Sequence, residues 1–149
     1  MILDQLKSTS KISYVPFTNT FRKYKGLNMS EKMIYMCLWS MSGEKNYCFP
    51  AIETIADELE ISESTVRRIL KSLDEKKCIY TIRQKNKETE KQLSNLYYII
   101  EFNPYEGKFN ENHYIQLEML YPTRIRYLDE EEIKNLSKKK KVSKENGNL

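Results

Sequence analysis

FPAIETIADELEISESTVRRILKSLDEKKCI, residues 49–79, is the stretch that decides the fold. It contains two segments in which apolar residues recur at positions i, i+3, i+4 and i+7, the spacing of one helix face. These residues are Ile52, Ile55, Ala56 and Leu59, and then Val66, Ile69, Leu70 and Leu73. Ser62 stands where the second helix needs an N-cap. The stretch therefore predicts two short amphipathic helices joined by a tight turn.

The exposed faces of the two helices differ in charge. The first carries Glu53, Asp57 and Glu58, which would repel phosphates. On the second, at 100° per residue, hydroxyl and basic side chains lie opposite the apolar stripe or beside it. They are Ser64, Arg68 and Lys71, flanked by Thr65 and Arg67. One such helix alone would indicate only a solvated face, but a brace helix before it favours a helix-turn-helix that reads the major groove of DNA.

The segments on either side extend this pattern. Upstream, Asn28 and Glu31 form a capping-box arrangement that opens a helix ending near Gly43, and its methionine stripe is interpreted as core filling. Downstream, Ile79–Arg83 and Leu96–Phe102 are strand candidates joined by a long polar connection. Such a hairpin after a recognition helix is a wing. Its basic side chains are Arg83, Lys85, Lys87 and Lys91.

The motif resembles the helix-turn-helix domain of plasmid and phage replication proteins and related regulators. The matching residues are Phe49, Pro50, Ala56, Leu59, Ile61, Ser62, Thr65, Val66, Arg68, Leu73 and Ile79. The resemblance covers about residues 13–103 and implies an α+β fold. That fold is a winged helix-turn-helix, a three-helix core with a β-hairpin wing, here followed by a short C-terminal extension and a basic tail.

The sequence departs from the family pattern at three positions. Ala51 replaces the usual Ser cap, and Glu60 and Lys77 replace glycines. Such glycines often have positive φ, so we expect either strain or a different turn at Glu60 and Lys77.

The chain divides into four parts by composition. Residues 1–12 are expected to be a flexible lead-in. Residues 13–103 are expected to be the DNA-binding domain, which begins with a short extended segment around residues 14–17. Residues 104–137 form an aromatic-rich extension that packs on the domain or on a second copy, and its segment 114–121 fits either strand or helix. Asp129 and Glu132 resemble a second capping box. Residues 138–149 are expected to be a disordered basic tail.

Composition limits the function. The net charge of the 149 residues is +4, and because the tail carries five Lys and one Glu, residues 1–137 sum to zero. DNA affinity must therefore come from local asymmetry. Ser62–Lys91 has nine basic and five acidic residues. The basic, aromatic-interleaved stretch at residues 21–25 is interpreted as a solvated loop with two packed aromatics.

The sequence offers no chemistry of its own. We find no catalytic constellation, and the three cysteines and single histidine have no metal-ligand spacing, so we expect neither an enzyme nor a metal or cofactor. No apolar run is long enough for a membrane span, and no signal peptide is recognised, so a cytoplasmic, nucleoid-associated protein is expected.

We expect sequence-preferring binding to double-stranded DNA. Ten residues are predicted contacts: Ser62, Ser64, Thr65, Arg67, Arg68, Lys71, Arg83, Lys85, Lys87 and Lys91. The resemblance implies a role in plasmid or phage replication initiation or its control, with the replication or transcription machinery as a further partner. One alternative is a dimeric transcriptional regulator whose homodimer forms through residues 105–136. Another is a winged-helix protein-interaction module without DNA binding.

Overall fold

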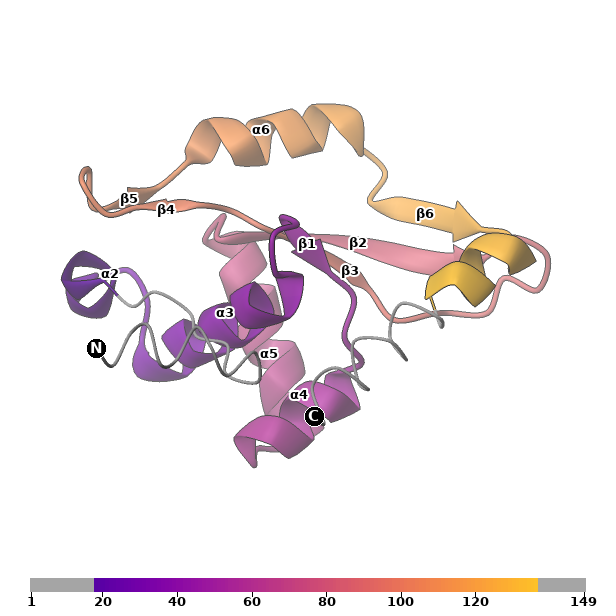
Figure 1. Ribbon diagram of the computed structural model, residues 1–149, viewed down its shortest axis with the longest axis horizontal. Helices are drawn as coiled ribbons and strands as arrows, with labels where there is room; N and C mark the ends of the chain where they lie inside the picture. Colours follow the sequence, from indigo (N-terminus) through magenta and orange to yellow (C-terminus); the bar gives the residue numbers. More distant parts are fainter. Residues whose placement is uncertain (1–17, 137–149) are drawn as a thin grey trace, which may run out of the picture.

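A four-stranded sheet lies between two layers of helices (Figure 1). The computed structural model describes residues 18–136, so the lead-in, the segment at 14–17 and the basic tail lie outside the described residues. The strands, in spatial order, are β1 (Tyr47–Cys48), β3 (Leu96–Ile99), β2 (Ile79–Asn86) and β6 (Ile125–Leu128). On one face lie α3 (Met29–Ser42), α4 (Ile52–Leu59) and α5 (Glu63–Glu75), and on the other α6 (Glu111–Leu120).

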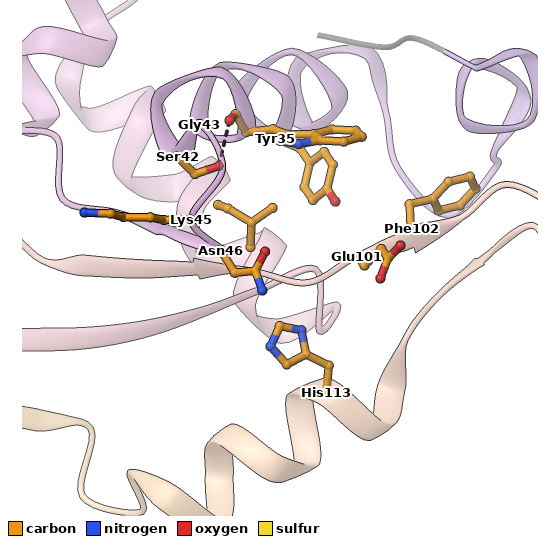
Figure 2. A pocket seen from close by; sticks show the side chains of 10 residues that line it. Tyr35, Ser42, Gly43, Lys45, Asn46, Glu101, Phe102 and His113 are labelled. Carbon is orange, nitrogen blue, oxygen red and sulfur yellow. Dashed lines mark hydrogen bonds between the residues drawn. The ribbon is translucent and has the colours of Figure 1, made fainter. Parts of the chain in front are cut away.

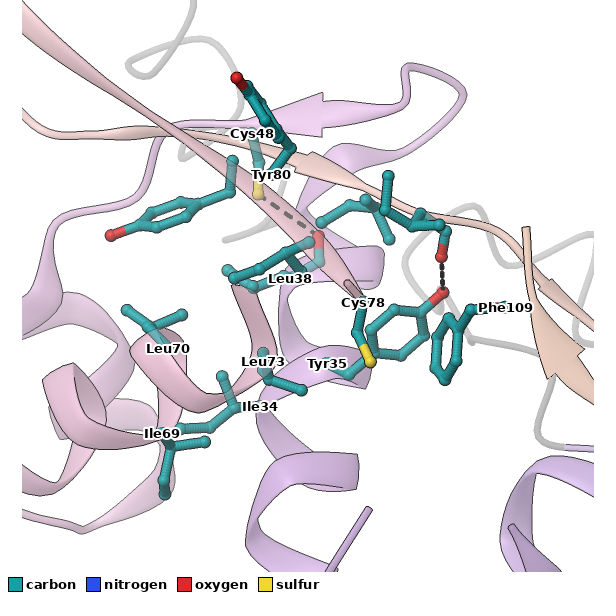
Figure 3. Close-up of a cluster of buried hydrophobic side chains, with 14 of the residues drawn as sticks. Ile34, Tyr35, Leu38, Cys48, Ile69, Leu70, Leu73, Cys78, Tyr80 and Phe109 are labelled. Atoms are coloured by element: carbon teal, nitrogen blue, oxygen red, sulfur yellow. Dashed lines mark hydrogen bonds between the residues drawn. The ribbon is translucent and has the colours of Figure 1, made fainter. Parts of the chain in front are cut away.

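The three-helix core forms as predicted. Asn28 caps α3 in a complete capping box with Glu31, and Gly43 ends the helix with a φ of 58°. The apolar stripe of α5 is buried against α3, where Ile34 and Leu38 point toward Ile69 and Leu73 (Figure 3). Burial of the four stripe residues of α5 is the main force that holds this helix on the domain.

The methionine stripe of α3 fills the core only in part. Met36 packs partly buried against the core, but the interpretation is wrong for Met29 and Met33. Met29 is 82% exposed and Met33 is 49% exposed, whereas Ile34, Tyr35 and Leu38 are buried. The helix is apolar on nearly every side, so hydrophobicity alone did not distinguish the face that turns inward.

The wing is longer and tighter than predicted. β2 continues to Asn86 instead of ending at Arg83, and Asn86 closes the hairpin because its Oδ1 accepts from the N–H groups of Glu88 and Thr89. The pairing shifts by one residue between Ile82↔Leu96 and Lys85↔Gln92, which places a bulge on the returning chain. Gln84 lies buried there, and its Nε2 donates to the carbonyl of Ser94 at 2.9 Å.

The extension folds onto the domain and completes its sheet. β4 (Phe102–Asn103) and β5 (Lys108–Phe109) form a small hairpin, and the undecided segment at 114–121 is mostly helical, within α6. β6 then pairs in parallel with the outer edge of β2, with Lys85 beside Tyr127. The capping box at Asp129 forms and opens a helix at residues 130–136.

An aromatic cluster closes the end of the core opposite the wing. Phe21, Tyr35, Phe102 and Phe109 pack with ring centroids 5.1–6.5 Å apart. Phe21 comes from a short helix, α2 (Asn19–Lys23), capped by Thr18, so the loop predicted at 21–25 is partly helical. The packing of Phe21 and Tyr24 is confirmed.

The α+β winged-helix prediction is confirmed: three helices on one face of the sheet are followed by a β-hairpin wing. Among the described residues, no helix combines the length and the apolar character that a membrane span requires.

Candidate nucleic-acid interface

Glu60 and Ser62 set the direction in which α5 leaves the turn. Glu60 adopts the left-handed conformation, with φ 55° and ψ 45°, and the N–H of Ile61 donates back to the carbonyl of Ala56 at 3.1 Å. Ser62 then caps α5 by accepting from the N–H of Thr65. The backbone conformation is the one a glycine would adopt, so the strain predicted at position 60 is present and the turn keeps its ordinary geometry.

Three hydroxyl groups gather at the N-terminus of α5. The Oγ of Ser62 lies 2.7 Å from the Oγ1 of Thr65 and 3.2 Å from the Oγ of Ser64. Ser62 and Ser64 are exposed and Thr65 is half-buried. The amides of a first helical turn attract anions, and these short side chains leave room for a phosphate or a base edge to approach.

Arg68 and Lys71 extend this surface along α5. Both side chains are exposed, and neither forms a hydrogen bond or ion pair with another residue of the described part of the chain. Arg67 beside them contacts Glu63 one turn earlier at 3.7 Å, with both side chains more than half exposed. An exposed pair of this kind is worth little, so DNA could displace Glu63 at small cost.

The other end of α5 is fixed by a second left-handed residue. Lys77 has a φ of 62°, its N–H donates to the carbonyl of Asp74, and the N–H of Cys78 donates to that of Leu73. These two bonds form a Schellman motif, which ends the helix and turns the chain into β2. Lys77 thus takes a left-handed conformation that glycine adopts at lower cost.

Two polar clusters hold the C-terminal half of α5, and sequence patterns did not predict either. In the first, the buried carboxylate of Glu31 accepts from Ser72 at 2.6 Å and from Lys76 at 2.8 Å. Burial raises the pKa of Glu31, but hydrogen bonds from the Asn28 N–H, Lys76 and Ser72 outweigh it and hold the pKa below its ordinary value. The cluster ties α3 to α5.

The second cluster ties the extension to α5. Arg124 contacts both carboxylate oxygens of Asp74 at 2.8 Å and donates to the Tyr114 hydroxyl at 2.6 Å. Its guanidinium lies 4.1 Å from the ring centroid of Tyr80. Asp74 also accepts from the N–H of Thr81 at 2.8 Å. Burial, reinforced by the Asp74 carboxylate, raises the pKa of Tyr114 to about 12. Arg124 and Asp74 are 50 residues apart in the sequence, so no local sequence pattern could predict their contact.

Two basic residues of the wing point to the side of the sheet on which α5 lies. Tyr80 packs against Tyr114 of α6, so even-numbered side chains of β2 point toward α6. Alternation along a strand then directs Arg83 and Lys85 toward the face that α3 and α5 cover. Arg83 is exposed and Lys85 is half-buried. Both lie past the part of this face that α3 and α5 cover. The structure therefore places these basic residues and α5 on one side of the molecule.

An acidic rim borders the wing on its β6 side. The N–H of Lys87 donates to the carbonyl of Leu128, and the next helical residues, Glu130, Glu131 and Glu132, are exposed. Of these, Glu132 contacts Arg126 at 3.7 Å. Lys91 lies on the returning chain, on the far side of β2 from β6, because its carbonyl accepts from the N–H of Asn86. A phosphate would thus meet less repulsion at Lys91 than at Lys87.

Residues 25–79 match the profile of a protein family described as a helix-turn-helix domain. The chain contains a helix-turn-helix. Such a domain suggests binding to double-stranded DNA. The match spans α3, β1, α4 and α5 and ends at the first residue of β2, so the wing and the extension lie beyond it. No significant match was found among curated proteins or among solved structures.

A pocket of about 270 Å³ lies away from this helix-turn-helix surface, between α3 and α6. His113 from α6 and Glu101 point toward the same space, below Tyr35 and Asn46 (Figure 2). None of the ten predicted contact residues lines it. Within residues 18–136, no group of three or more His, Cys, Asp or Glu side chains is placed to hold a metal ion.

Proposed function

We propose that the protein binds double-stranded DNA with a sequence preference, with α5 in the major groove and the wing on the flanking backbone. The proposed contacts are the ten residues predicted from the sequence: Ser62, Ser64, Thr65, Arg67, Arg68, Lys71, Arg83, Lys85, Lys87 and Lys91. The observation that carries the proposal is the exposed face of α5, where Arg68 and Lys71 have no partner among the described residues and a hydroxyl cluster opens the helix.

Each group has its own part in this proposal. Arg68 pairs with the O6 and N7 atoms of a guanine, because arginine fits that edge with two hydrogen bonds. Ser62, Ser64 and Thr65, with the free amides of the first turn, bind a phosphate. The wing lysines contact phosphates without reading sequence, so they set affinity and salt dependence.

The biological role we propose is plasmid or phage replication initiation or its control. Its support is the resemblance of the motif at residues 49–79 to replication proteins of that kind. Transcriptional regulation by a dimer is the second candidate, and it is favoured by the extension, which forms the outer strand of the sheet.

The test is retention of genomic DNA fragments by the purified full chain at two salt concentrations, with the retained sites sequenced. Enrichment of repeats at a replication origin supports the first role, and enrichment of promoter palindromes supports the second. No retention at low salt contradicts DNA binding and leaves the protein-interaction alternative.

A matched pair of variants tests the assignment of Arg68. Arg68→Ala should weaken binding to the selected site by about 1–3 kcal/mol and relax the preference at one base pair. Glu53→Gln, on the exposed face of α4, is the control and should leave the base preference unchanged. If Arg68→Ala weakens all sequences equally, Arg68 contacts a phosphate instead of a base.

A further inference from the structure

β6 is an edge strand whose outer side has no partner strand among residues 18–136. Its inner side is paired with β2. The N–H of Arg83 donates to the carbonyl of Arg124, and the N–H of Lys87 donates to the carbonyl of Leu128, each at 2.8 Å. Successive residues of a strand direct their backbone groups to opposite edges. The N–H and C=O groups of Ile125 and Tyr127 therefore point outward, as a template for one more strand.

One large side chain of this edge is exposed. Tyr127 is 51% exposed, although it belongs to a strand of the sheet. It stands beside Lys85, so it lies on the side of the sheet that faces α5. An unpaired edge with an exposed tyrosine is the kind of surface that another chain covers.

We propose that β6 pairs antiparallel with β6 of a second copy of this chain, across a two-fold axis at Tyr127. The charge sequence around the strand supports the choice of a second copy. Arg126 lies within β6, and acidic residues 129–132 follow the strand. Antiparallel pairing of two identical strands brings Arg126 of each copy close to the acidic segment of the other, in addition to its exposed contact with Glu132 of its own chain.

The same charges select the register. Centring the pairing on Arg126 would place two arginines opposite each other, and centring it on Ile125 would place Arg124 opposite Arg126 of the partner subunit. Like charges directly opposite destabilise a sheet. Centring it on Tyr127 instead pairs the two tyrosines and places Arg126 opposite Leu128 of the partner subunit.

The dimer would join two four-stranded sheets into one of eight strands. Its two-fold axis stands perpendicular to the sheet, so both copies of α5 lie on the same side of it. Two recognition helices on one side, related by a two-fold axis, suit a palindromic site. Only this last consequence rests on the proposed DNA binding, and the pairing itself is tested without DNA.

The mass of the full chain in solution, measured by light scattering, tests the pairing. The wild type should have about twice the 17.8 kDa of one chain. Tyr127→Lys, a charged substitution at an edge, should weaken dimerisation at least about tenfold. The control is Tyr105→Lys, at a tyrosine that is 97% exposed elsewhere, and it should remain dimeric. A monomeric wild type, or a dimer that Tyr127→Lys leaves intact, would overturn the proposal.

Cross-linking tests the register and does not depend on the stability of the lysine variant. In a Cys37→Ser background, the remaining Cys48 and Cys78 are buried. Tyr127→Cys should then form an intermolecular disulfide under mild oxidation, because each new thiol faces its own copy across the axis. Ile125→Cys should cross-link more slowly, since it would face Asp129 of the partner subunit. Equal rates, or no cross-link at Tyr127→Cys, would contradict the pairing.

Discussion

The guanidinium of Arg124 contacts both carboxylate oxygens of Asp74 at 2.8 Å, and this pair joins the chain beyond α6 to the last turn of α5. Asp74 simultaneously accepts from the first part of β2 through the N–H of Thr81. A single carboxylate thus fixes the recognition helix, the wing and the extension relative to one another. Arg124 adopts a φ of 56° at this point, so backbone strain accompanies the contact.

Asp74→Asn should destabilise the protein. The change leaves Arg124 without its counter-ion in a partly buried site, and we expect the free energy of unfolding to fall by about 1–3 kcal/mol. Urea denaturation measures it. Glu63→Gln removes one partner of the exposed pair with Arg67 and should change stability by less than about 0.5 kcal/mol. Equal effects in the two variants would show that the Asp74 cluster is no more important than a surface pair.

Replacement of Glu60 by glycine should stabilise the fold. The left-handed conformation at Glu60 costs a residue with a Cβ more than it costs glycine, so Glu60→Gly should raise the free energy of unfolding by about 0.5–1 kcal/mol. Glu60→Ala keeps the Cβ and is the control. Thermal melts of both variants measure the difference, and a Glu60→Ala variant as stable as Glu60→Gly would argue against strain at this position.

Acid should weaken the link between α3 and α5. The folded-state pKa of Glu31 lies below its ordinary value of 4.5, so its contribution to stability is complete above that pH. The contribution is lost as pH falls through the lower folded-state pKa. Glu31→Gln should therefore be less stable than wild type at neutral pH and show a shallower loss of stability below about pH 5. Urea denaturation across this range provides the curves, and parallel curves would contradict the prediction.

Removing the acidic rim should strengthen DNA binding. In Glu130→Gln/Glu131→Gln, two negative charges beside the wing disappear, and we expect affinity for any duplex to rise by a few fold, most clearly at low salt. Glu111→Gln/Glu118→Gln, which removes the same number of charges from α6 at the opposite face of the sheet, is the matched control. Fluorescence anisotropy at several salt concentrations measures both variants. An equal rise in the control would indicate an effect of net charge alone.

Local signals predicted most of the helix-turn-helix. Ser62 and Asn28 are caps whose effect is exerted within one turn, and the stripe from Val66 to Leu73 determines which face of α5 is buried. These features depend on neighbours in sequence, so spacing alone reveals them. Even the left-handed residue at Glu60 was marked by the resemblance, because a glycine is usual there.

The features that escaped prediction depend on distant partners. β6 is a strand because β2 has a free outer edge, and only the folded sheet provides one. Met33 is apolar yet exposed because Tyr35 and Ile34 fill the core side of α3. Of the site, the sequence indicated the exposed face of α5, but not the side of the sheet to which Arg83 points or the acidic rim beside the wing.

Because β2 is paired with β3 along one edge and with β6 along the other, the wing cannot swing as an ordinary two-stranded hairpin does. Any hinge motion at its base would have to break hydrogen bonds on both edges at once. The wing is therefore set at a fixed angle to α5 before a duplex arrives, and little conformational entropy is lost when it contacts the backbone. The flexibility of the DNA then contributes to the choice of site. A duplex that bends easily toward a rigid wing is bound with a lower deformation energy than a stiff one.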